Sequence, residues 1–331
     1  MPDFPSPTTL FAPIFVLFVV IEWIAVKQGK AAGKYEAKDA ITSMTMGLGN
    51  VVVNTLSGVV SLWALMLFWK FRVTDIPFTW WSFAVLFVLF DFLYYWKHRF
   101  YHRMRIWWTE HVVHHSSKEY NLTTALRQPW TGPFMGHIFL AAPFVIAGFH
   151  PAFIFFIGGI NLVYQFWIHT EAIDKMPKWF EAIFNTPSHH RVHHATNPRY
   201  LDSNYAGVFI IWDRMFGSFV PELDSDRPIY GIVKPVDSYN PIIVAYHEAA
   251  SLIKDCAGDG LRPDIWLRRM INQPGWSPNG KHMRTPELKM AYLNKYPGEA
   301  GQPGLKLAKV DKNSQRNSPH ASLPLREDTP R

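Results

Sequence analysis

Five apolar stretches in the first half of the chain constrain its fold most strongly. Residues 9–26 are almost wholly apolar, with Glu22 as their only charge, and they are long enough to cross a bilayer as one helix. Further apolar stretches cover about residues 44–69, 78–96, 134–149 and 151–168. The sequence therefore predicts an all-α, multi-span membrane bundle of four to five apolar segments, in which the last two form a short hairpin.

The positive charges around these stretches predict their orientation. Four lysines follow the first stretch, whereas a secretory signal would carry its positive charges before it. The positive-inside rule puts these lysines in the cytoplasm, although Lys70 and Arg72 would then lie outside. Counting spans onward, we expect the histidine-rich segments to share the cytoplasmic face of a bacterial inner membrane or the endoplasmic reticulum.

The composition narrows the kinds of site that the chain can build. A single cysteine, Cys256, excludes an intramolecular disulfide framework, an iron–sulfur cluster and a CxxC zinc site, so a metal would have to be held by His, Asp or Glu. The net charge of +7 borders the apolar stretches and accompanies no recognisable nucleic-acid-binding module. It therefore favours anionic lipid over nucleic acid as a partner.

Four regions follow from these patterns. We expect N-terminal spans over residues 1–77, a histidine-rich domain with the membrane hairpin over 78–220, and a cytosolic helical region over 221–297. Residues 178–184 and 241–254 have the mixed spacing of helices that lie on the membrane or pack on a cytosolic core. Residues 298–331 are rich in Pro, Ser, Lys and Asn, which predicts a disordered tail.

Eight of the 15 histidines fall into one HxxxH and two HxxHH patterns. Residues three and four apart share a helix face, so we expect each pattern to project its imidazoles toward a common point. Together they are too many for one tetrahedral ion, which predicts a centre of two metals with higher coordination. The histidines concerned are His98, His102, His111, His114, His115, His190, His193 and His194.

Two other kinds of metal site are disfavoured. A zincin would need HExxH, but His247 and Glu248 are followed by no second histidine at that spacing. The ExxH pairs of carboxylate di-iron bundles are also missing from the three patterns.

The ordered histidine patterns between membrane spans resemble the fatty acid hydroxylase and sterol desaturase superfamily of membrane di-iron oxygenases. The likeness is strong over about residues 80–220 and is closest to the alkylglycerol monooxygenase type and its bacterial relatives. It rests on the strings DFLYYWKHRFYH, HVVHHSSKEYNLTTALRQ, YQFWIHTE and NTPSHHRVHHATNPRYLDSNYAGVFIIWDRMFGSF. One departure is Arg103, which stands where the alkylglycerol type has Glu directly after the first pattern.

The resemblance also implies further ligands. It adds His169, at the end of the last span, to the eight patterned histidines. The HxxHH register favours His190 over the neighbouring His189, the turn residue His150 is not expected to be a ligand, and His137 is left open.

Several polar residues are expected around the metal ligands. Asp91 and Tyr95 share a helix face with His98 and His102, where either side chain can orient an imidazole through its second nitrogen. The resemblance strings add further polar candidates, namely Asn121, Arg127, Gln128, Asn204 and Asp213.

The resemblance implies two iron ions, because O2 reduction needs a redox-active metal, whereas imidazole alone also suits zinc, copper and nickel. The implied reaction is oxidation of a lipid C–H bond, by a monooxygenase acting on an alkylglycerol or by a sterol or fatty-acyl desaturase or hydroxylase. The electron donor would be external: tetrahydrobiopterin, or a cytochrome b5 or ferredoxin type of protein. A non-catalytic zinc-binding membrane protein is the alternative from another class, and the oligomeric state is open.

Overall fold

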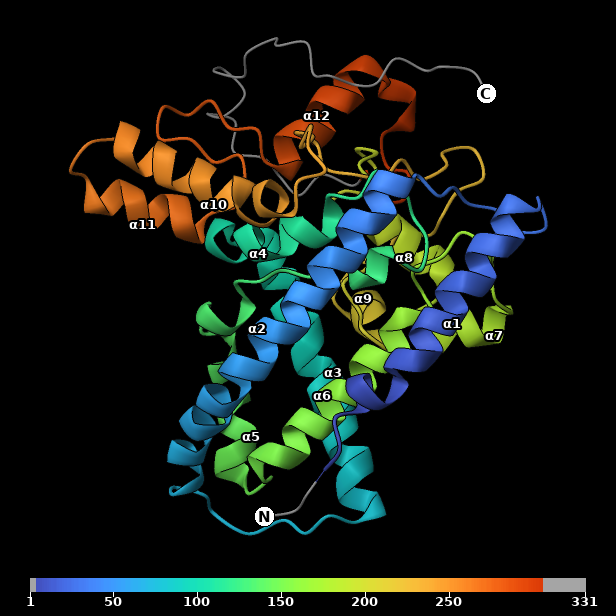
Figure 1. Ribbon diagram of the computed structural model, residues 1–331. Helices are drawn as coiled ribbons and strands as arrows, with labels where there is room; N and C mark the ends of the chain where they lie inside the picture. Colours follow the sequence, from blue (N-terminus) through green and yellow to red (C-terminus); the bar gives the residue numbers. More distant parts are fainter. Residues whose placement is uncertain (1–3, 306–331) are drawn as a thin grey trace.

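The computed structural model describes residues 4–305 and consists of helices and connecting loops, with three isolated β-bridges and no named strand in that range. Four long helices form a bundle: α1 (Pro7–Lys27), α2 (Ala37–Trp69), α3 (Trp80–Arg103) and α6 (Pro151–Phe166). In Figure 1 most of the other helices gather toward one end of this bundle, whereas α5 (Ala142–Ala147) lies at the opposite end. The expected all-α class is thus confirmed for the described residues.

Among the described residues, two helices are long and apolar enough to cross a membrane. The most apolar 18-residue windows of α1 and α2 have mean hydropathies of 2.4 and 2.0, and only 6% of each window is buried inside the protein. A core helix of a soluble protein would be covered by other elements, whereas these helices expose apolar side chains along their length. This exposure suits contact with lipid.

The expected hairpin over residues 134–168 contains several short helical segments before α6, where its hydropathy predicted two continuous helices. It consists of η2 (Gly132–Phe134), η3 (His137–Ala141), the short α5 (Ala142–Ala147) and then α6. Gly148 reverses the chain at a φ of 114°, and a Cβ atom there would lie 2.3 Å from the Thr74 carbonyl oxygen. Leu86, Val145 and Ile157 belong to the fully buried apolar core of this end of the bundle.

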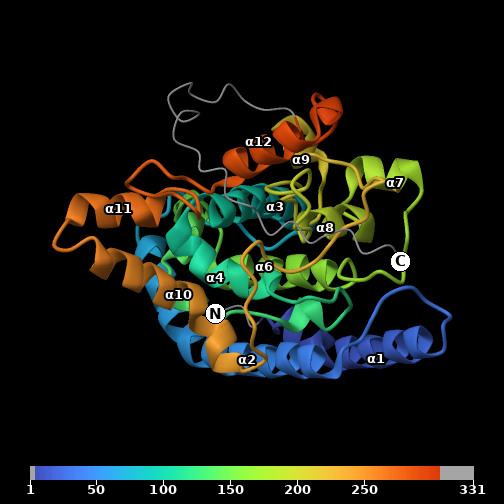
Figure 2. The same ribbon diagram turned by 90° about the horizontal axis from the view of Figure 1, so that it is seen from above.

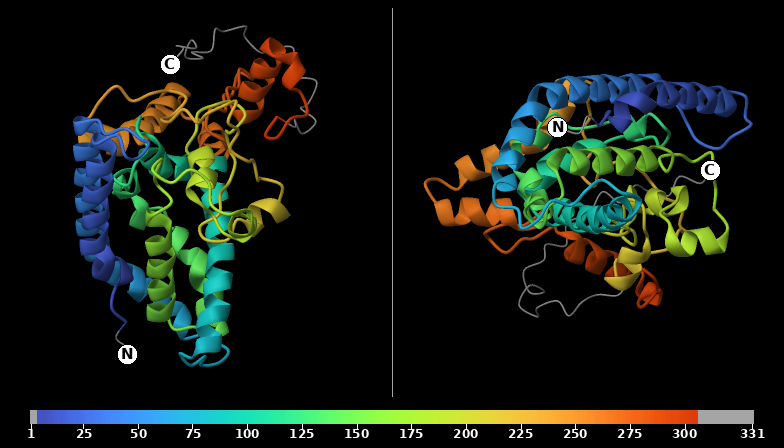
Figure 3. Two further views of the ribbon diagram at one scale, coloured as in Figure 1. Left: turned by 90° about the vertical axis from the view of Figure 1, so that its right-hand side faces the viewer. Right: turned by 90° about the horizontal axis from the view of Figure 1, so that it is seen from below.

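The end of the bundle that carries the histidines is built from short helices. They are α4 (Arg105–His115), η1 (Thr124–Leu126), α7 (Lys178–Ile183), α8 (Pro187–His193) and α9 (Ile211–Met215), followed by α10 (Pro241–Gly258), α11 (Pro263–Ile271) and α12 (Thr285–Lys295). Figure 2, which looks onto this end, shows α4 and α8 within the bundle outline and α10 and α11 at its side. Figure 3 shows α12 beyond the end of the long helices. The two segments expected to be helical, 178–184 and 241–254, coincide with α7 and most of α10.

The start of the expected disordered tail is ordered. Residues 297–299 form η4 (Pro297–Glu299), and the Leu305 side chain is almost fully buried. Arg199 binds this segment by donating to the Gln302 side chain and the Pro303 carbonyl at 3.0 and 3.2 Å. The rest of the expected tail, residues 306–331, lies outside the described range.

Candidate metal centre

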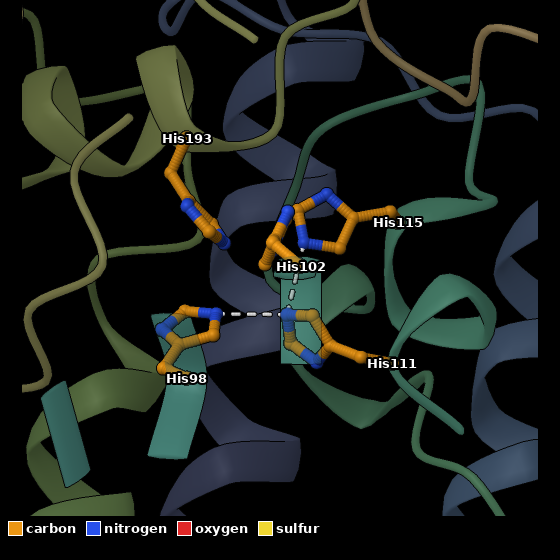
Figure 4. A group of neighbouring side chains, drawn as sticks. All are labelled: His98, His102, His111, His115 and His193. Carbon is orange, nitrogen blue, oxygen red and sulfur yellow. Dashed lines mark hydrogen bonds between the residues drawn. The ribbon is translucent and has the colours of Figure 1, made fainter. Parts of the chain in front are cut away.

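Nine buried histidines form two groups in the described residues. In the first group the ligand nitrogens all lie within 4.8 Å of one another, and Figure 4 shows the five imidazoles pointing toward a shared centre. The nitrogens of the second group meet the same limit. The first group is His98, His102, His111, His115 and His193, and the second is His114, His169, His190 and His194.

Two of the three sequence patterns, the HxxHH patterns, supply histidines to both groups. On α4, His111 and His115 are four residues apart and enter the first group, while His114 points to the second. On α8, His193 enters the first group, whereas His190 and the C-cap residue His194 enter the second. The expectation that each pattern converges on one point was wrong for the two HxxHH patterns, because each of these helices lies between the two groups and supplies histidines to both. The HxxxH pair, His98 and His102, does converge on the first group.

Main-chain carbonyls orient several of the imidazoles. The Nδ1 atoms of His98, His193 and His169 lie 2.7, 2.9 and 2.7 Å from carbonyl oxygens of residues 205, 203 and 165, respectively. Since a carbonyl only accepts, each Nδ1 carries the proton and each Nε2 keeps a free lone pair. This is the arrangement in which histidine presents Nε2 to a metal.

The Nε2 atoms approach one another in a way that hydrogen bonding alone does not explain. Those of His98 and His111 are 2.8 Å apart, and those of His169 and His190 are 3.0 Å apart. The Nε2 atoms of His102, His193 and His194 are buried and have no hydrogen-bond partner. Lone pairs that converge without protons between them fit a bound cation at each group.

Burial keeps these imidazoles neutral. It lowers the pKa of His111, His114 and His115 on α4 well below 6.5, and it acts in the same way on His190 and His193 of α8. Burial also lowers the pKa of His169 to about 4. Because only the neutral imidazole binds a metal, both groups are ready for metal near pH 7 without losing protons.

Asp91 and Tyr95 do not contact an imidazole. The Asp91 carboxylate accepts hydrogen bonds from the Val208 and Phe209 amides at 2.8 and 3.0 Å, from Trp212 Nε1 at 2.9 Å and from the Asn161 side chain at 2.7 Å. Tyr95 bonds to side chains outside both groups. The expected direct contact was wrong: Asp91 instead holds the segment whose Tyr205 carbonyl orients His98.

Asp213 and Asn204 support the same segment. Asp213 accepts the amides of Tyr205 and Ala206, both at 2.8 Å. Asn204 adopts a φ of 54°, and its side-chain amide donates to the His189 carbonyl on α8 at 3.0 Å. Both residues therefore act on the histidines through the backbone.

Of the three polar residues expected near the ligands that follow α4 in the sequence, one contacts a grouped histidine. Arg127 is fully buried, forms a 2.9 Å ion pair with Asp39, and has its carbonyl 3.3 Å from His114 Nδ1. Asn121 donates to the Lys34 carbonyl, and Gln128 donates to the Ala125 carbonyl. Arg127 is therefore linked to a histidine of the second group, whereas Asn121 ties its loop to the connection between α1 and α2 and Gln128 bonds within its own loop.

The remaining histidines near the centre lie outside both groups. His189 packs against the Phe219 ring, so the structure brings His190 rather than His189 into the second group. His150 caps α6 by accepting from the Ala152 amide. His137 lies 3.6 Å from Glu110, and neither residue joins a group.

Asp202 is the side chain that the sequence reasoning missed. It lies in a loop at a φ of 58°, and its Oδ1 is 3.5 Å from His102 Nδ1. Its Oδ2 accepts from Gln273 at 3.1 Å and lies 3.7 Å from Arg103 Nε. Arg103, the residue that departs from the alkylglycerol type, thus pairs with a carboxylate that neighbours the first group.

Asp202→Asn is expected to weaken metal binding. The amide removes the charge beside His102 Nδ1, and loss of such a ligand partner lowers metal affinity by about 10–100-fold. Competition with a chelator, followed by metal analysis, measures this change. Asp226→Asn is the matched control, because Asp226 pairs with Arg199 in a nearby loop and contacts no grouped histidine. Equal chelator resistance in the two variants would contradict the role assigned to Asp202.

Comparisons with known proteins agree with this geometry. The fatty acid hydroxylase family model matches residues 83–218, a range that holds all nine grouped histidines. The chain is 38% identical to the human alkylglycerol monooxygenase over 259 residues, which are 76% of this chain and 55% of that protein. It is 35% identical to the enzyme of that name from Xenopus tropicalis over 87% of this chain and 63% of the relative. For the Danio rerio protein the identity is 41% over 70% of this chain and 50% of the relative.

The chain therefore spans about half to two thirds of the length of these relatives. No solved structure matches it.

Proposed function

Since residues 83–218 form a fatty acid hydroxylase family domain, we propose that the chain is a membrane-bound di-iron oxygenase that hydroxylates the ether-linked carbon of an alkylglycerol. The observation that carries the proposal is the convergence of nine buried imidazoles in two groups inside this segment. The enzyme name shared by the listed relatives supports the substrate class.

The nine histidines are the proposed metal ligands. The first group would hold one iron and the second group the other, and the iron pair would supply the chemistry of O2 activation. The carbonyls of Tyr205, Ser203 and Gln165 fix the tautomers of His98, His193 and His169 before a metal binds. The protein thus preorganises the ligands and excludes water from them by burial.

The proposed reaction balances with an external two-electron donor. The lipid carbon bonded to the ether oxygen loses one C–H bond and gains a hydroxyl from O2, while two electrons and two protons reduce the other oxygen atom to water. The product is a hemiacetal, which separates into a fatty aldehyde and glycerol. Tetrahydrobiopterin or a protein of the cytochrome b5 or ferredoxin type is the proposed donor, and the active face is proposed to be cytoplasmic.

The proposed membrane arrangement extends beyond the two candidate spans. We place α3 and the α5–α6 hairpin in the bilayer beside α1 and α2, because their buried residues form one apolar core with α2. The histidine groups would then lie just above the lipid, within reach of a substrate whose alkyl chain remains in the bilayer.

The purified chain in lipid nanodiscs tests the proposal directly. We expect about two irons per chain, and O2 consumption with an alkylglycerol that yields the fatty aldehyde in the presence of one of the donors. A monoacylglycerol of equal chain length is the matched control substrate, since its ester carbon carries no hydrogen to remove. Zinc as the sole metal, with no O2 consumption after iron loading, would favour a zinc-binding membrane protein. Activity on sterols or acyl chains alone would favour the desaturase or hydroxylase alternative.

A further inference from the structure

The outward face of α10 is apolar from Ile242 to Ile253. Ile242, Ile243, Tyr246 and Ile253 are exposed, with Ile253 70% accessible. The small residues Ala250 and Ala257 continue the same stripe at a spacing of three or four residues. A helix that borders water normally turns polar side chains outward. An exposed apolar face of this kind is therefore expected to contact lipid or another protein surface.

The opposite face of α10 already has its partners. Val244 and Ala245 are buried in a cluster with α4 and α2. Arg105 of α4 donates to Glu248 at 2.7 Å and to Asp255 at 2.6 Å. The helix is therefore held with its charged face toward the protein and its isoleucines away from it.

The stripe lies at the level where α2 changes from polar to apolar. Met46 of α2 packs in the same cluster as Val244 and Ala245, and Thr42 donates to the Tyr239 carbonyl just before α10. At this level α2 exposes Ile41, Met44 and Leu48. α10 thus packs on α2, one of the two candidate spans, at the point where the exposed residues of α2 become apolar.

The hairpin formed by α10 and α11 extends sideways from the bundle, as Figures 1 and 2 show. Its tip carries Leu261, which is 93% exposed, and α11 exposes Leu267 and Ile271. The basic residues Lys254 and Arg268 are also exposed on this hairpin. Apolar side chains beside basic ones are the composition of helices that lie in the headgroup region of a membrane.

We propose that the α10–α11 hairpin lies on the lipid surface, with the Ile242–Ile253 stripe of α10 buried at the boundary between headgroups and acyl chains. The position of α10 beside the candidate span α2 and the exposed basic residues favour lipid over a second copy of the chain as the occupant. The hairpin would then anchor α4, and with it three of the grouped histidines, at a fixed height above the bilayer. This inference does not depend on the proposed reaction.

Spin labels in the full-length protein test the hairpin placement. The native cysteine is first removed by Cys256→Ser, and a spin label is attached at Ile253→Cys. Two exposed positions serve as references: Val59→Cys on α2 for lipid and Asn294→Cys on α12 for water. The protein is reconstituted in vesicles that contain anionic lipid, and collisions with O2 and with a water-soluble nickel chelate are measured. We expect O2 to relax the label at 253 several-fold more than the chelate does, as at position 59.

Two results would overturn the proposal. A chelate accessibility at 253 equal to that at 294 would mean that the stripe faces water. Spin–spin broadening at 253, removed by dilution with unlabelled protein, would mean that a second copy covers it. Circular dichroism and metal content of each labelled variant establish that the fold is intact before the comparison.

Discussion

His193→Ala is expected to abolish O2-dependent lipid oxidation while the protein still inserts in the membrane. His193 presents an unpartnered, buried Nε2 to the first group, and its Nδ1 is held by the Ser203 carbonyl. Its loss removes one ligand and leaves a cavity that the rigid helix α8 cannot refill. We expect activity below detection and less than two irons per chain, measured by product formation and metal analysis of the membrane fraction. His114→Ala should do the same through the second group.

His189→Gln is the matched control for this experiment. His189 neighbours His190 on α8 and is buried, but it belongs to neither group. The variant should keep its iron and most of its activity. If His193→Ala retained most of its activity, the ligand assignment would be refuted; if His189→Gln lost its iron as completely as His193→Ala, the choice of His190 over His189 would fail.

Asp91→Asn should destabilise the protein by about 3–5 kcal/mol, because hydrogen bonds to a charged group contribute about 1.5–3 kcal/mol each and unpaired buried donors add their own cost. The Asp91 carboxylate accepts from four donors and donates to none. An amide in its place turns an N–H group toward two of these donors. Thermal or denaturant unfolding in detergent, followed by circular dichroism, measures the loss.

Asp75→Asn is the control for Asp91→Asn. Asp75 pairs with Arg72 at the surface, where water replaces a lost ion pair, so the unfolding midpoint should not move. A shift below about 1 kcal/mol for Asp91→Asn would contradict the role of Asp91 in holding the 205–212 segment.

The sequence predicted the composition of the centre better than its geometry. Spacing identified eight histidines, resemblance added His169, and the structure brings all nine together. Their division into two groups depends on the rotation of α4 and α8 about their axes. That rotation depends on long-range packing, such as the packing of α4 against α3 and α10, which local spacing does not encode.

The roles of the two aspartates near the centre also depend on contacts that the local sequence does not encode. Asp91 stood out as a carboxylate inside an apolar stretch, yet its partners Val208 and Phe209 are more than 110 residues away in the chain. Asp202 had no local signal, since it approaches His102 from a loop one hundred residues later. Long-range pairing decides the role of both residues, so the sequence could mark Asp91 as unusual but not say what it binds.

Because α4 and α8 each carry histidines of both groups, binding of a metal ion at one group would affect binding at the other. Placing His111, His115 and His193 around a first ion fixes the same two helices that carry His114, His190 and His194. Any shift of α4 or α8 on binding the first ion would also move the ligands of the second position, so the two positions would not fill independently. A metal titration of the unloaded protein would then depart from the curve for two independent sites.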